Sequence, residues 1–147
     1  MAFNFRLQKI LDIKEKEEDD RKNAASIANK KVEIANMELG DLLEEYKLKG
    51  QERVLKISDG SQLSEVLEIN GYIDYLGKAI DKKKIEIKKL EQEADERKDE
   101  YLESRKTRKT YDNLKEKTYK RFLQEEQKEE AKVIDQIVSY TYTKKIK

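Results

Sequence analysis

The stretch VLEINGYIDYLGKAIDKKKIEIKKL, residues 66–90, carries the apolar repeat that decides the fold. Its apolar side chains recur in alternating steps of three and four residues, and the same rhythm continues to residue 101. Nine of its eleven positions are apolar or aromatic: Val66, Ile69, Ile73, Leu76, Ile80, Lys83, Ile87, Leu90, Ala94, Arg97 and Tyr101. A repeat of this kind is typical of a helix that packs in a coiled coil.

A matching repeat precedes it, between residues 7 and 46. Its positions are Leu7, Leu11, Lys14, Glu18, Arg21, Ala25, Ala28, Val32, Ala35, Leu39, Leu42 and Tyr46. Three consecutive positions are charged, because residues 14–23 are polar throughout. A strict seven-residue repeat drifts relative to a straight helix, so we expect the two stripes to wind around each other with a left-handed twist.

The break between the two repeats is best placed at SDGS, residues 58–61. Gly60 tolerates a positive φ, and Asp59 or Ser61 could cap the second helix. The dipeptide Asn70–Gly71 is a rival turn, but it lies inside the regular repeat, so we interpret it as a soft spot within a helix.

These signals predict an all-α fold over residues 1–147, an antiparallel left-handed coiled-coil hairpin. We expect a first helix over about 2–56, a turn at about 57–61, a second helix over about 62–141, and a disordered tail at 142–147. At 1.5 Å per residue the helices would measure about 75 and 120 Å, so the second is longer.

Folding back near residues 57–60 pairs residues whose numbers add up to roughly 115–120. The polar stretch 14–23 then lies opposite residues 92–106, which are also poor in apolar groups. Acid-before-base pairs four residues apart, such as Glu17 with Arg21 and Glu18 with Lys22, would keep this part helical, each contributing about 0.2–0.5 kcal/mol.

Composition restricts the function classes. Charged residues make up 44% of the chain and hydrophobic ones 36%, which argues against a thick core. The net charge of +1 selects neither a membrane surface nor nucleic acid. A basic section at residues 105–121 is explained by the acidic section 12–20, which lies near it in the proposed pairing. Without a long apolar run, we expect a soluble, cytoplasmic protein that binds no nucleic acid.

No pattern in the chain predicts an enzyme. A two-helix hairpin lacks a deep pocket, His and Cys are absent, and no glycine-rich phosphate loop follows a strand. We therefore expect no catalytic residues, no metal site, no cofactor and no small-molecule substrate.

Two apolar groups remain without cover in this scheme. Near the bend, Tyr72 and Tyr75 cannot both point into one narrow seam, so at least one should face solvent or a partner. Near the end of the chain lie Tyr119, Phe122, Leu123, Val133, Ile134, Ile137 and Val138. Because the second helix extends beyond the first, something else must cover this group.

The stretches FNFRLQKILDIKEKEEDD, residues 3–20, and YIDYLGKAI, residues 72–80, resemble the FliJ family of flagellar type III export proteins. The resemblance implies an antiparallel coiled coil similar to the γ-subunit shaft of rotary ATPases. It also implies that the terminal end enters the hexameric flagellar export ATPase and that the other end faces the export gate, a membrane protein. Family members further assist export chaperones, which implies a place at the cytoplasmic face of the inner membrane, at the flagellar base.

Carried over by position, the resemblance assigns a gate-facing surface to Leu42, Tyr72, Leu76, Ala79 and Lys83, where some relatives have His at the last position. Leu42 and Leu76 also lie on the predicted seam, so they could serve either surface. We assign the ATPase contact to the terminal end, through Phe3, Phe5, Leu7, Glu17, Glu18, Phe122, Ile134, Ile137 and Val138. Here the charges of residues 14–23 would provide a solvated surface that binds no single subunit tightly.

Two other functions compete with this one. The repeats could pair between chains in a homodimeric tether or in the stator stalk of another ATPase, or the arms could act as a holdase-like chaperone. A hairpin formed within one chain should be a monomer by itself.

Overall fold

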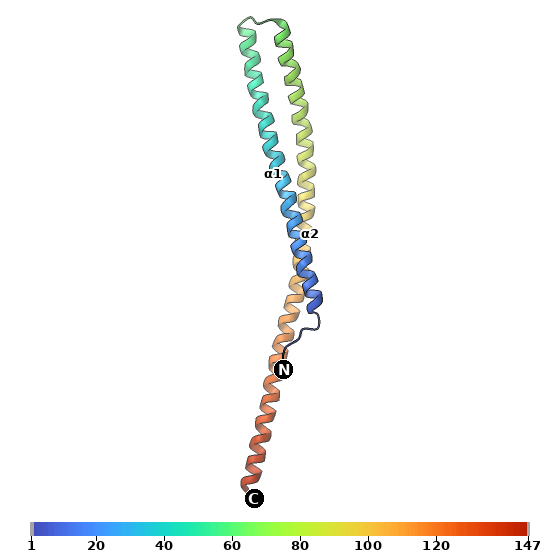
Figure 1. Cartoon of the computed structure of the whole chain (residues 1–147), viewed down its shortest axis with the longest axis vertical. Helices are drawn as coiled ribbons and strands as arrows, with labels where there is room; N and C mark the ends of the chain where they lie inside the picture. The colour runs from blue at the N-terminus through green and yellow to red at the C-terminus, as the bar shows by residue number, and fades with distance from the viewer. Residues whose placement is uncertain (1, 147) are drawn as a thin grey trace. The chain divides into compact units, whose positions relative to one another are not determined.

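The computed structural model describes residues 2–146, which form two long helices joined by a short turn (Figure 1). Helix α1 spans Gln8–Ser58 (51 residues) and α2 spans Leu63–Ile146 (84 residues). The two helices pack against each other as a hairpin, and no strand occurs among residues 2–146. The predicted all-α hairpin with a longer second helix is confirmed.

Contacts along the hairpin group into two compact units. The central unit is Asp20–Tyr101, which contains the turn and the facing stretches of α1 and α2. The terminal unit combines the segment before Asp20 with the segment after Tyr101. Each unit therefore brings together stretches that lie far apart in the sequence.

The seam follows the predicted repeats. All eleven repeat positions of α2 between residues 66 and 101 are buried or half-buried, and so are ten of the twelve positions of the first repeat, residues 7–46. Arg21 and Tyr46 are the two exposed exceptions. The buried apolar side chains are Phe5, Leu11, Ala25, Ala28, Ala35, Ile73, Leu76, Ile80, Ile87 and Ala94, and Leu11 and Leu76 are only 1% exposed.

The turn is built around Gly60, the glycine with a positive φ (71°) in the described chain. The amide of Gly60 donates to the carbonyl of Ile57 (3.3 Å), and the amide of Ser61 donates to that of Lys56 (3.1 Å). This pair of bonds is the Schellman motif, which satisfies the last carbonyls of a helix. On the other side, the carbonyl of Gln62 accepts from the amides of Glu65 and Val66 and starts α2.

The start of α1 differs from the prediction. The helix begins at Gln8, whereas the first helix was expected to start near residue 2. The amide of Gln8 donates to the carbonyl of Phe5 (3.1 Å), which tightens the chain just before the helix. Phe5 is buried, and Phe3 packs on aromatic rings of α2. These contacts hold the first residues out of the helix.

The end of α2 also differs from the prediction. The helix continues to Ile146, five residues beyond the expected end and into the tail that was expected to be disordered. Residue 147 of that tail lies outside the described chain. Thr143 lies in this last part and its hydroxyl donates to the carbonyl of Ser139 (2.8 Å), a bond that a helical backbone permits.

The register differs slightly from the expected one. Partner numbers add up to 121 for both Arg21 with Glu100 and Glu38 with Lys83, and to 126 for Glu18 with Arg108. The predicted sum of 115–120 holds for Glu45 with Tyr72, which add up to 117, but is too low for these three pairs. The bend centres on Gly60 and Ser61, after the residues from which that sum was calculated.

The interpretation of Asn70–Gly71 as a soft spot within a helix is confirmed. Helix α2 passes through both residues without interruption. The side-chain oxygen of Asn70 accepts a hydrogen bond of 3.2 Å from Arg53 on α1, which ties this position to the facing helix.

Candidate functional site

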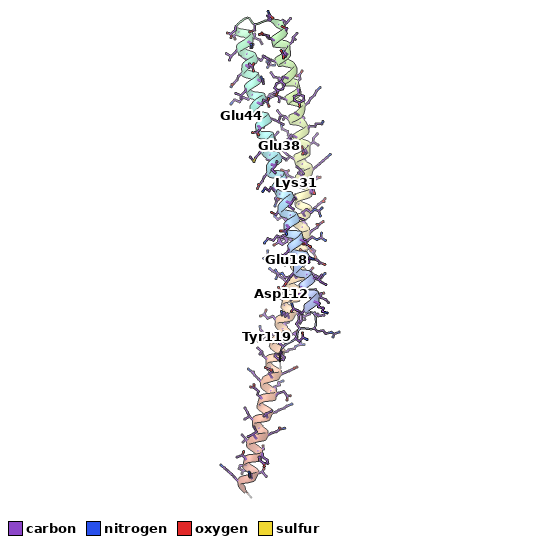
Figure 2. The ribbon with its side chains drawn as sticks, viewed as in Figure 1. Glu18, Lys31, Glu38, Glu44, Asp112 and Tyr119 are labelled. Carbon is purple, nitrogen blue, oxygen red and sulfur yellow. The ribbon has the colours of Figure 1, made fainter. Side chains whose placement is uncertain are left out.

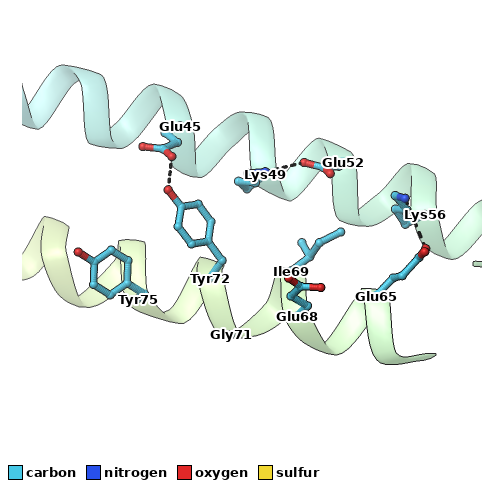
Figure 3. A pocket seen from close by; sticks show the side chains of 10 residues that line it. All are labelled: Glu45, Lys49, Glu52, Lys56, Glu65, Glu68, Ile69, Gly71, Tyr72 and Tyr75. Atoms are coloured by element: carbon cyan, nitrogen blue, oxygen red, sulfur yellow. Dashed lines mark hydrogen bonds and ion pairs between the residues drawn. The ribbon is translucent and has the colours of Figure 1, made fainter. Parts of the chain in front are cut away.

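A groove of about 760 Å³ opens between the helices near the turn, in the central unit (Figure 3). Acidic and basic side chains alternate along it around a small apolar floor. Its lining residues are Glu45, Lys49, Glu52, Lys56, Glu65, Glu68, Ile69, Gly71, Tyr72 and Tyr75. Lys49 pairs with Glu52 (3.0 Å), and Lys56 pairs with Glu65 across the hairpin (3.4 Å).

Tyr72 reaches across the groove from α2 towards α1. Its hydroxyl donates to the carboxylate of Glu45, and this bond raises the pKa of Tyr72 above its usual value. The Lys49 ammonium lies 5.5 Å from the centre of the Tyr72 ring, and Tyr75 stacks on the other side at 6.0 Å. Tyr72 is 37% and Tyr75 63% exposed, so the prediction that at least one of them faces outward is confirmed.

The other residues assigned to the gate-facing surface differ in exposure. Leu76 is buried in the seam, whereas Leu42 and Ala79 are half-buried at its edge. Lys83 pairs with Glu38 on α1 and with Glu86 on its own helix, and these carboxylates raise the pKa of Lys83. In the closed hairpin Leu76 therefore belongs to the seam, and Tyr72 is the most exposed member of the set.

The polar section of α1 holds an ion pair between Glu18 and Arg108 in the terminal unit. Figure 2 labels Glu18 on α1 and Asp112 on α2 in this region. Arg108 donates from two nitrogens to the two carboxylate oxygens of Glu18, and from a third nitrogen to Asp112. The hydrogen bond from Arg108 lowers the pKa of the Glu18 carboxyl. Glu18 is therefore bound to α2, and the expectation that it belongs to a solvated surface is not met, while Glu17 remains exposed beside Lys14.

A second ion pair supports the adjacent part of α1 in the central unit. Arg21 donates to Glu100 (2.8 Å), which also accepts from Arg97 (3.2 Å), and these bonds lower the pKa of Glu100. Pairs within α1 were expected for Glu18 and Arg21, but both side chains bridge to α2. The stretch of α2 that lies opposite supplies a cation for Glu18 and an anion for Arg21. The sequence of α1 alone does not show these partners.

Aromatic rings close the terminal end of the hairpin. Phe3 meets Tyr119 edge to face at 5.1 Å and Phe122 at 5.4 Å, so the N-terminal segment is fastened to α2. Phe5 is buried, and Leu7 and Phe122 are half-buried. Two of the predicted contact residues, Phe3 and Phe122, are thus brought together, and Phe5 and Leu7 are at least partly covered within the chain.

Beyond Phe122, helix α2 leaves its apolar side chains exposed. The large apolar residues there are Leu123, which is 39% exposed, and Val133, Ile134, Ile137, Val138, Tyr140 and Tyr142, each between 51% and 69% exposed. Among the described residues, the prediction that this end of α2 lacks cover holds for Val133, Ile134, Ile137 and Val138. It does not hold for Tyr119 and Phe122, which were placed in the same group but pack against Phe3.

Sequence reasoning missed a further apolar group on both sides of the turn. Leu48, Leu55, Leu63 and Leu67 are all more than half exposed, although each is a large aliphatic residue. In the sequence, these leucines lie next to the positions of the seam repeat and not at them. Their place outside the repeat was the signal that could have predicted their exposure.

Two searches of the described chain gave negative results. Among residues 2–146, no helix is long and apolar enough to cross a membrane. Within the same residues, no three His, Cys, Asp or Glu side chains are grouped so that they could hold a metal ion.

Comparison with known proteins identifies the family. The family model described as "Flagellar FliJ protein" matches residues 3–147. A comparison with curated proteins gave no significant match. Among solved structures, the chain is similar to a YscO homolog, CT670, from Chlamydia trachomatis, with 18% sequence identity over 97% of this chain and 96% of that one, at a TM-score of 0.46. Since the family model spans nearly the whole chain, this protein belongs to the flagellar FliJ protein family.

Proposed function

We propose that the protein is a non-enzymatic accessory protein of flagellar type III export that couples the hexameric export ATPase to the export gate. The family match over residues 3–147 supports this role most directly. A large apolar surface left open on a helix commonly marks a site of protein interaction. The exposed end of α2 is such a surface, and it lies at the terminal end that the proposal assigns to the ATPase.

The terminal residues divide into two groups in this proposal. Ile134, Ile137 and Val138 contact the ATPase, because they are exposed and have no apolar cover within the described chain. The half-buried or buried group Phe3, Phe5, Leu7 and Phe122 instead braces α2 at the base of its extension. In the same way, Glu17 contributes to the outer surface, while Glu18 holds the helices together.

The gate-facing surface centres on Tyr72. Leu42, Ala79 and Lys83 flank it, and Leu76 supports it from the seam beneath. The groove beside Tyr72 provides charged and aromatic groups within one surface, which suits a polar peptide segment. The proposal also includes transfer of export chaperones and a position at the cytoplasmic face of the inner membrane, at the flagellar base.

One structural observation favours this role over a tether that pairs between chains. The seam residues of α1 and α2 bury one another within a single chain, so the repeats need no second chain to be covered. A tether built on these repeats would first have to open the hairpin.

The test measures binding to the purified export ATPase hexamer and stimulation of its ATP hydrolysis. Replacing Ile134 by Ser should weaken binding at least tenfold and reduce stimulation. Ile57→Ser is the matched control, because Ile57 and Ile134 are both isoleucines with 59% exposure, and Ile57 lies beside the turn. Equal binding by both variants and the unaltered protein would refute the assignment of the ATPase contact.

A further inference from the structure

Helix α1 carries a second seven-residue repeat on its outer face, within the central unit. We define the outer row as every seventh residue of α1 from Ile27 onwards: Ile27, Ile34, Asp41, Leu48 and Leu55. The four aliphatic members are each between 48% and 63% exposed, and Asp41 is exposed as well. A row of large aliphatic side chains left open on a helix commonly marks a site of protein interaction.

The outer row keeps a constant direction relative to the seam. Its first three members each come one residue before a seam position, at Ala28, Ala35 and Leu42. One residue is about 100° of helix rotation, so the outer row occupies a different face of α1 from the seam. Because both repeats have a period of seven residues, they drift around α1 at the same rate. A third helix that follows the twist of the hairpin therefore stays on the outer row from end to end.

The positions between the members of the outer row are mixed. Lys30, Met37, Glu44 and Gln51 each follow a member by three residues. Met37 is 71% exposed and extends the apolar part of the surface. Glu44 is exposed beside Asp41, so the surface has apolar ends and an acidic centre.

Acidic side chains dominate this section of α1. Residues 32–46 contain five acidic residues and no basic one. Two of the five are held by α2, because Glu38 accepts from Lys83 and Glu45 accepts from Tyr72. The remaining three leave a net negative charge on the outer face of α1.

The acidic centre itself has no partner in the described chain. Neither Asp41 nor Glu44 forms a side-chain hydrogen bond or an ion pair within residues 2–146. Carboxylates between apolar layers favour a cationic partner and oppose an anionic one. An anionic membrane surface is therefore disfavoured. A second copy docked through the same row is also disfavoured, since the register that aligns the apolar layers brings the two acidic centres together.

We propose that the outer row is the docking surface for one helix of a partner protein, a helix that repeats large apolar residues every seven positions and carries lysine or arginine in its central layers. The apolar residues of that helix cover the four aliphatic members of the row. Its cations pair with Asp41 and Glu44. Helix α1 then lies between α2 and the partner helix, with one of them packed on each of two faces.

The length of the outer row suits a stable pair. The row spans 28 residues, or four heptads, which is about 42 Å of helix. Coiled coils are typically sustained over three to four heptads. Docking on the outer row leaves the buried residues of the seam in place, so the hairpin does not have to open.

This surface is separate from those used in the proposed function. No residue assigned to the ATPase contact or to the gate-facing surface belongs to the outer row. The inference therefore does not rest on that function. Variants of the outer row should stimulate the export ATPase as the unaltered chain does, so the two proposals can fail independently.

A synthetic peptide tests the proposal on the full chain. The probe is a helix of about 30 residues with lysine in its two central layers, glutamine opposite Lys30 and Gln51, and leucine in the other layers. A second peptide has glutamate in the two central layers and is otherwise identical. Fluorescence anisotropy at nanomolar peptide should show that the lysine peptide binds at least tenfold more tightly. Equal binding of the two peptides, or no binding of the lysine peptide, would overturn the proposal.

Charge reversal in the chain tests whether the acidic centre provides this preference. The double variant D41K/E44K should reverse it and bind the glutamate peptide more tightly. E96K/D99K is the matched control, because Glu96 and Asp99 are likewise exposed and three residues apart, but lie on α2. The control should keep the preference for the lysine peptide. If D41K/E44K keeps that preference too, another surface binds the peptide and the proposal fails.

The apolar part of the surface has its own matched pair of variants. Ile27→Ser should weaken binding of the lysine peptide at least tenfold. Ile85→Ser should leave the binding unchanged, although Ile27 and Ile85 are both 58% exposed and both belong to the central unit. Circular dichroism should show equal helicity for the two variants, because neither residue is buried in the seam. Equal binding by I27S and I85S would contradict the assignment of the outer row.

Two further measurements test for other modes of binding. Sedimentation equilibrium of the chain alone should show no dimer that depends on Ile27, and a dimer that is lost in I27S would assign the row to a second copy instead. Spin labels at Lys22→Cys and Lys98→Cys, which line one groove between the helices, should keep their distance when the peptide binds. A longer distance would mean that the peptide opens the hairpin and enters the seam, which would also overturn the proposal.

Discussion

Arg108 on α2 holds both carboxylate oxygens of Glu18 on α1, at a position of the seam where a coiled coil usually places apolar side chains. Both side chains are largely shielded from solvent, and Asp112 binds the same guanidinium. Because the contact has two hydrogen bonds, it fixes the orientation of the two side chains relative to each other in addition to providing charge attraction. The polar section of α1 is therefore joined to α2 by geometry that the apolar repeat does not provide.

A double-mutant cycle should detect this contact. We expect Glu18→Ala and Arg108→Ala to be coupled by about 1 kcal/mol in the free energy of unfolding, measured by urea denaturation. Glu116 and Lys120 form the comparison, because this pair is exposed and lies within one helix. Its coupling should not exceed about 0.5 kcal/mol. Equal coupling in the two cycles would show that the Arg108 contact adds nothing specific.

Stability should fall in acid, in part because of Glu18. Arg108 lowers the pKa of the Glu18 carboxyl in the folded state below its ordinary value of 4.5. The ionised group therefore stabilises the fold above about pH 4.5, and this contribution is lost as the pH falls through the lowered folded pKa. Urea denaturation between pH 7 and 3 should show a smaller loss for Glu18→Gln than for the unaltered protein. Parallel curves would contradict this sign.

Overpacking the seam should destabilise the hairpin. Ala28 is buried, so Ala28→Leu should lower the free energy of unfolding by about 1–3 kcal/mol. Ala131→Leu makes the same change at an exposed position of α2, where the stability should change by no more than about 0.5 kcal/mol. Thermal denaturation of both variants provides the comparison, and a stable A28L variant would mean that the helices separate readily at this level.

Two glycines should respond to alanine in opposite directions. Gly60 has a φ of 71°, which alanine adopts only with strain, so Gly60→Ala should cost about 1 kcal/mol. Gly40 is exposed within α1 and has no neighbouring atom near the position of a new Cβ. Gly40→Ala should therefore stabilise the protein by about 0.5–1 kcal/mol. A stabilising G60A substitution would place the bend elsewhere.

Substitutions at the adjacent residues Tyr75 and Leu76 should have different effects, one on partner binding and the other on the stability of the fold. Leu76→Ala should lower the free energy of unfolding by about 2–5 kcal/mol, because the side chain is almost completely buried. Tyr75→Ala should leave stability within about 0.5 kcal/mol, because most of the ring is exposed. If the groove is the gate-facing surface, Y75A should still weaken binding to the purified cytoplasmic part of the gate protein. Unchanged binding would remove Tyr75 from that surface.

The sequence by itself determined the two helices and the residues of their seam. The repeat from Val66 to Tyr101 has a period of 3.5 residues, and only a helix packed against another helix buries such a stripe continuously. Gly60 also revealed the bend, because few residues adopt its backbone conformation. The exposed end of α2 followed from the unequal lengths of the two repeats.

Tertiary structure decided what the polar positions do. Glu18 and Arg21 have several possible partners within reach along α1, and their actual choice of Arg108 and Glu100 depends on which residues of α2 lie opposite. A bend shifted by one residue moves the sum of partner numbers by two, so sequence spacing alone could not fix these pairs. The packing of Phe3 on Tyr119 likewise delayed the start of α1 to Gln8, because aromatic contacts with a distant part of the chain outweighed the local preference for helix.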